Sequence, residues 1–239
     1  MDSTLSLRLL GSSLVAWLPL LIQGIAGGAE PSSLDLKENL DLPFNSQGGS
    51  DDDEEAPEII VFYGQQYEAD GIFFCCDKSG SMRLAGKFEK LQREVIKNLQ
   101  TFTTRVQFGI VFFDSHLERF PPSGRPAQAT SDMKAAGMNM VLSSRCGGGT
   151  CPKPALVASL DFANQASSRR KVIIYLSDGL NSCPGLDMTV YNDDILREVR
   201  RRNTSGVRIN TIALGDKTDE EWMRTLAMQN NGTFARIGQ

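Results

Sequence analysis

Runs of consecutive apolar residues alternate along this chain with stretches in which apolar residues recur every three or four positions. The clearest run, Ile-Phe-Phe-Cys-Cys at 72–76, ends abruptly at Asp77 and predicts a central strand buried on both faces. Further strands are predicted at 106–113, 171–176, 207–214 and 233–237, and a short strand at 59–63 is expected at the edge of the domain.

Helices are predicted between these strands. An apolar stripe of the kind found on an amphipathic helix packed against a sheet is formed by Phe88, Leu91, Val95, Leu99 and Phe102. The other predicted helices cover 131–142, 152–166, about 192–202 and a segment begun by a capping box of Thr218 and Glu221.

Strands that alternate with helices predict an α/β fold with a doubly wound, mostly parallel sheet that is covered by helices on both faces. The segment Leu117–Phe120 follows the strand at 106–113 closely enough to return as one short antiparallel edge strand before two prolines stop it. The domain is expected to span residues 58–239.

The residues before this domain have a different character. Arg8 precedes an apolar run at 9–26 and a few small residues, so residues 1–29 are expected to be a signal peptide or an N-terminal membrane anchor. Either alternative puts the domain outside the cytoplasm, secreted or membrane-anchored. Residues 30–57 contain the acidic block 51–55 and few large apolar residues, which predicts an acidic flexible tether.

Composition adds two limits. The chain has 239 residues, of which 41% are hydrophobic, so it can bury one sizeable core. Its formal net charge is -4, and the basic residues of the predicted domain are scattered apart from 169–171 and 200–202. Binding to nucleic acid is therefore not expected.

Polar residues follow the strand at 72–76 within a single turn. Asp77, Ser79 and Ser81 supply one carboxylate and two hydroxyls, and Gly80 lets the backbone bend between the serines. Mg2+ prefers oxygen ligands of this kind, but it needs more of them than one turn provides. The sequence therefore predicts that further ligands come from other loops.

Thr150 and Asp178 are the candidates for these further ligands. Thr150 follows three glycines at the start of a predicted helix, and Asp178 comes directly after the strand at 171–176 and Ser177. Ligands bind beyond the carboxyl ends of the strands in open α/β sheets, so both residues are expected to approach Asp77 at that edge.

The sequence Asp77-x-Ser79-x-Ser81, the glycine-preceded Thr150 and the pair Asp178-Gly resemble the metal-ion-dependent adhesion site of von Willebrand factor type A domains, and the resemblance spans most of the predicted domain. It implies that Ser79, Ser81 and Thr150 coordinate Mg2+, or Mn2+ or Ca2+ in its place. Asp77 and Asp178 would act mostly through bound water. The resemblance further implies a protein-binding module, not an enzyme, in which a partner's Asp or Glu completes the metal's ligands.

Many domains of that family end in a helix whose sliding couples metal binding to a change of shape. Gly238 and Gln239 follow the last predicted strand in this sequence. A constitutive binder is therefore the expectation.

Two alternatives to a binding module are kept. The first is a metal-dependent hydrolase or phosphatase, although Ser79 stands where such phosphatases need a second aspartate and no Glu or His in the motif could activate water. The single histidine, His116, lies on another loop, so neither a catalytic triad nor a zinc site is expected. The second alternative is a structural domain that does not use its metal, with serines that only cap the following turn.

The five cysteines cannot all pair with one another. Cys75 and Cys76 are adjacent on the central strand, so their side chains are expected to point to opposite faces and to be buried as thiols. Cys146, Cys151 and Cys183 surround the predicted metal site. One disulfide among these three would hold the glycine-rich loop and leave one thiol, and three free thiols are the alternative.

Overall fold

The structure is a computed structural model that describes residues 56–238. The predicted signal peptide or anchor at 1–29 lies outside the described residues, as does the predicted tether at 30–57 except for its last two positions. Within residues 56–238, no helix is long and apolar enough to cross a membrane.

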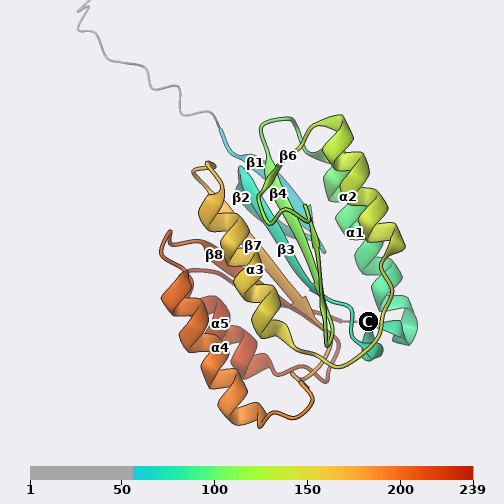
Figure 1. The fold of residues 1–239 in the computed structure, drawn as a ribbon, viewed down its shortest axis with the longest axis vertical. Coiled ribbons are helices and arrows are strands. Elements are labelled where there is room, and N and C mark those ends of the chain that lie inside the picture. The colour runs from blue at the N-terminus through green and yellow to red at the C-terminus, as the bar shows by residue number, and fades with distance from the viewer. Residues whose placement is uncertain (1–55, 239) are drawn as a thin grey trace, which may run out of the picture. The chain divides into compact units, whose positions relative to one another are not determined.

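A mostly parallel sheet forms the centre of the domain, with its strands in the order β5-β4-β3-β7-β8-β9 (Figure 1). The five strands from β4 to β9 run parallel, whereas β5 and β6 each pair antiparallel with β4. The strands are β3 (Gly71–Asp77), β4 (Gln107–Phe113), β5 (Leu117–Phe120), β6 (Ala127–Gln128), β7 (Lys171–Ser177), β8 (Arg208–Leu214) and β9 (Phe234–Ile237).

Helices cover both faces of this sheet, which confirms the predicted doubly wound α/β fold. α1 and α2 pack on one face and α3, α4 and α5 on the other (Figure 1). The helices are η1 (Gly80–Gly86), a short 3-10 segment, α1 (Lys87–Thr101), α2 (Ser131–Ser143), α3 (Pro152–Gln165), α4 (Met188–Arg202) and α5 (Glu220–Met228).

The central strand β3 joins the two cores. All seven of its residues are buried, and alternate side chains enter opposite cores because successive residues of a strand point to opposite faces. Cys76 lies in the core under α1, whereas Cys75 lies in the core under α3. The prediction of two buried thiols on opposite faces is therefore confirmed.

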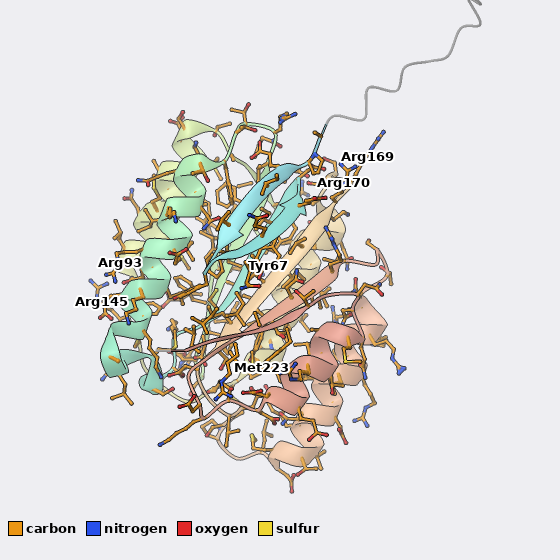
Figure 2. The ribbon with its side chains drawn as sticks, turned by 180° about the vertical axis from the view of Figure 1, so that it is seen from behind. Tyr67, Arg93, Arg145, Arg169, Arg170 and Met223 are labelled. Carbon is orange, nitrogen blue, oxygen red and sulfur yellow. A yellow bond between two sulfur atoms is a disulfide. The ribbon has the colours of Figure 1, made fainter. Side chains whose placement is uncertain are left out.

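The strand predicted at 59–63 forms, but it does not join the main sheet. β1 (Glu58–Phe62) pairs antiparallel with β2 (Gln65–Ala69) in a separate hairpin, seen from behind in Figure 2 with Tyr67 on its second strand. Successive side chains of β1 point to opposite sides, so Ile60 and Phe62 are buried in the core under α1, whereas Ile59 and Val61 are exposed. One apolar side of the hairpin thus covers a face of the main sheet.

Two helix starts differ from the predicted ones because aspartates provide the N-caps. The Asp187 side chain accepts hydrogen bonds from the backbone N–H groups of Thr189 and Val190, so α4 begins earlier than predicted. At α5 the cap is Asp219, whose side chain accepts from the N–H of Trp222, and not the predicted Thr218.

Candidate metal-binding site

The polar residues predicted to bind metal meet at the carboxyl ends of β3 and β7. These two strands are parallel neighbours, and the chain leaves β3 toward β4 on one side and reaches β7 on the other. Such a switch point opens a crevice at the sheet edge, where ligands bind in open α/β folds.

Asp77 forms the buried floor of this region. Its side chain accepts hydrogen bonds from the backbone N–H of Ser79 at 2.6 Å and from the hydroxyl of Ser177, the last residue of β7, at 2.7 Å. Burial raises the pKa of the Asp77 carboxyl to about 6, while these hydrogen bonds act in the opposite direction. A cation nearby would favour its ionised form.

Ser79, Ser81 and Asp178 place oxygens side by side above this floor. Ser79 Oγ lies 3.1 Å from Ser81 Oγ, and the Ser81 hydroxyl donates to Asp178 Oδ1 at 2.7 Å. Adjacent ligands of an octahedral Mg2+ at about 2.1 Å from the metal would be about 3.0 Å apart. The spacing and the chemistry of these oxygens therefore fit a small divalent cation.

The glycine-rich loop brings Thr150 to the same edge. Gly147 N–H donates to the backbone O of Lys78 at 2.9 Å, and Gly80 N–H donates to the backbone O of Gly148 at 3.2 Å. Thr150 then exchanges two backbone hydrogen bonds with Ser182, at 2.8 and 3.0 Å. The loop is thus fixed to both the β3 and the β7 ends of the site.

Glycine is required where this loop approaches its neighbours. An ideal Cβ on Gly149 would lie 2.5 Å from the backbone O of Ser182, closer than real Cβ contacts. Gly148 has φ +66, in the left-handed region, and a Cβ there would lie 2.9 Å from Ser115 Oγ.

One disulfide closes the same region. Cys151, directly after Thr150, is bonded to Cys183, directly after Ser182, and Cys146 remains a half-buried thiol. The prediction of one disulfide and one remaining thiol among these three cysteines is confirmed.

These residues border a cleft of about 650 Å³. Ser79, Ser81, Thr150 and Asp178 line it, whereas Asp77 lies beneath it, fully buried. Lys87, the first residue of α1, also lines the cleft, and its ammonium lies 2.6 Å from Asp178 Oδ2.

Within residues 56–238, no group of three or more His, Cys, Asp and Glu side chains could hold a metal ion. A metal at this cleft would thus depend on hydroxyl oxygens together with the two aspartates. His116 is mostly exposed on the loop after β4, with its backbone N–H donating to Asp114, as expected for a solvated residue.

A match to a known protein family identifies the family of this domain. The profile of the von Willebrand factor type A domain matches residues 71–237. The chain belongs to this family. Such VWA domains generally mediate contacts between proteins, including adhesion.

A curated relative and two solved structures resemble this VWA domain. Human inter-alpha-trypsin inhibitor heavy chain H4 is 25% identical over 176 residues, which cover 70% of this chain but only 18% of that protein. A von Willebrand factor type A structure from Catenulispora acidiphila has 19% identity and a TM-score of 0.61, covering 76% of this chain and 46% of its own. Proximal thread matrix protein 1 from the mussel byssus, with a zinc-occupied MIDAS motif, has 18% identity and a TM-score of 0.52, covering 75% and 43%. At these identities the two structures support the shared fold alone.

Two lysines at the VWA site were not predicted from the sequence. Lys78, between Asp77 and Ser79, is buried and forms ion pairs with Asp114 at 2.7 Å and Glu118 at 3.2 Å, which tie the β3 loop to the end of β4. Its position inside the motif is a weak sequence signal of this role. Lys87 gave another weak signal, a cation at the first position of a helix, where cations are unfavourable.

Proposed function

We propose that this VWA domain is a protein-binding module that depends on a divalent cation. Ser79, Ser81 and Thr150 would hold Mg2+, or Mn2+ or Ca2+, through their hydroxyls, and Asp77 and Asp178 would support the cation's remaining ligands. When bound, the cation supplies a positive charge that accepts an Asp or Glu side chain from a partner protein.

The convergence of the Ser79, Ser81 and Asp178 oxygens on one cleft is the observation that carries this proposal. Serine and threonine hydroxyls are neutral, so they leave most of the charge of a divalent cation uncompensated. The Asp178 carboxylate already accepts from Ser81 and pairs with Lys87. An acidic group from outside is therefore the ligand such a site would favour.

Binding, not hydrolysis, is the proposed activity. In the described part of the chain, the residues that line the cleft include no His, Glu or Cys that could act as a base or nucleophile, and both aspartates of the lining are already paired, Asp178 with Lys87 and Asp216 with Arg236. Asp77 is unsuited to attack a substrate because it is fully buried and both of its oxygens accept hydrogen bonds.

Export is proposed along with this function. The Cys151–Cys183 disulfide is of a kind that forms in oxidising compartments, which supports a domain placed outside the cytoplasm.

Titration calorimetry of the full chain with MgCl2 and MnCl2 tests the proposal. We expect saturable binding by the wild type and at least tenfold weaker binding by Asp77→Ala and Thr150→Ala. Ser182→Ala is the matched control, because Ser182 lines the same cleft with an exposed hydroxyl outside the proposed ligand set. Equal affinity in Thr150→Ala and Ser182→Ala would remove Thr150 from the site, and no saturable binding by the folded wild type would contradict the proposed function.

A further inference from the structure

Lys87 makes a contact that the proposed metal site does not require. Its Nζ lies 2.6 Å from Asp178 Oδ2, while Asp178 Oδ1 accepts from Ser81. The pair is secluded from solvent, since the side chain of Asp178 is 0% exposed and that of Lys87 is 12% exposed. An ammonium therefore contacts the same carboxylate that would support a metal.

The local structure does not explain a lysine at this position. Lys87 is the first residue of α1, and the positive end of the helix dipole disfavours a cation there. The chain reaches it through two residues with left-handed backbone, Ala85 at φ 54 and Gly86 at φ 64, which is an unfavourable conformation for alanine. Both unfavourable features belong to the turn that places Lys87 beside Asp178.

We propose that Lys87 is an internal counter-ion of the metal site, and that a divalent cation binds in competition with its ammonium. This inference rests on the proposed function, because it takes Asp178 as part of the metal site. A buried carboxylate without a partner is costly, so the ammonium stabilises the domain when no metal is bound. A divalent cation beside the same carboxylate repels the ammonium, so the metal must displace Lys87 from Asp178, and the cost of breaking that ion pair weakens metal binding.

Because the metal must displace the Lys87 ammonium, its affinity for the site is lower than the same oxygen ligands would give without that lysine. The competition also links the two states of the site: the cleft is filled either by the Lys87 ammonium or by a divalent cation that can accept a partner's carboxylate. The affinity of the domain for an acidic partner would then follow the concentration of divalent cations around the protein.

Removing the Lys87 charge tests this competition. The full chain, stripped of metal by a chelator, is titrated with MgCl2 as wild type, Lys87→Gln, Lys87→Arg and Lys217→Gln. Lys217 lines the same cleft, so its substitution removes the same charge from the same region. We expect Lys87→Gln to bind Mg2+ at least tenfold more tightly than wild type, and the other two variants to stay within threefold. Without metal, Lys87→Gln should also melt at a lower temperature than Lys217→Gln.

A measurement on the wild type keeps the test independent of the folding of any variant. The ammonium resonance of Lys87 is followed by nitrogen NMR during the MgCl2 titration, with Lys87→Arg used to assign it. We expect this signal to be visible without metal, because pairing slows its exchange with water, and to lose that protection as Mg2+ saturates the protein.

The possible results separate this inference from the proposed function. Equal or weaker Mg2+ binding by Lys87→Gln, or a Lys87 signal that saturating Mg2+ does not change, would overturn the competition and leave the metal site standing. Binding by Lys87→Gln alone, without binding by the wild type, would support the competition but contradict the proposed function of the wild-type protein. No saturable binding by any of the four proteins would overturn both.

Discussion

The disulfide between Cys151 and Cys183 allows a quantitative prediction about the loop that carries Thr150. The bond joins residues 32 positions apart. Chain entropy lost by the unfolded state on closing a loop of that length corresponds to about 3.7 kcal/mol at 25 °C. Replacing both cysteines by alanine should therefore lower the free energy of unfolding by about 3–4 kcal/mol.

Urea denaturation followed by circular dichroism measures this loss. With a slope of about 2 kcal/mol per molar urea, the midpoint should fall by roughly 2 M in the double variant. Cys146→Ala is the control, because Cys146 is a thiol outside the disulfide, and its midpoint should move far less. A double variant whose midpoint lies within about 0.5 M of the wild type would show that this bond does not close the loop in the native protein.

Three other substitutions test the packing of the domain by the same assay. Gly232→Ala should destabilise it by more than about 3 kcal/mol, because the new Cβ would lie 1.9 Å from the backbone O of Ile209, whereas Gly238→Ala meets nothing within 4 Å and should cost little. Phe162→Ala should cost about 3–5 kcal/mol, since this ring is fully buried; a loss below about 1 kcal/mol would contradict its place in the core. Thr130→Ala removes the side-chain cap of α2 and should cost about 1 kcal/mol, and an unchanged midpoint would show that the cap is dispensable.

The central strands, and the meeting of the five candidate residues at one edge of the sheet, could be predicted because their signals are local. Continuous apolar runs mark strands buried on both faces, and an aspartate directly after such a run marks the carboxyl edge of the sheet. β3 and β7 are parallel neighbours in the structure, so their carboxyl ends bring Asp77 and Asp178 to the same edge. The Thr150 loop followed from its glycines, whose lack of a side chain allows the close approach to Ser182.

The hairpin and the two lysines could not be predicted because their positions depend on contacts distant in sequence. β2 contains Gln65, Gln66 and Glu68, so its sequence lacks the apolar run of a central strand, and its pairing with β1 appears only in the fold. Lys78 pairs with Asp114, 36 residues away, and Lys87 with Asp178, 91 residues away. A lysine in a sequence is usually a solvated surface residue, and the weak local signals of these two do not reveal their distant partners.

A crystal structure of the protein grown with MnCl2 tests the proposed metal site directly, because the anomalous scattering of manganese identifies the ion and its position. We expect one anomalous peak within about 2.5 Å of the Ser79 and Ser81 hydroxyl oxygens, with the Lys87 ammonium moved away from Asp178. A peak elsewhere, or no peak while Lys87 stays paired with Asp178 and Ser81 still donates to it, would contradict the claim that this cleft binds a divalent cation.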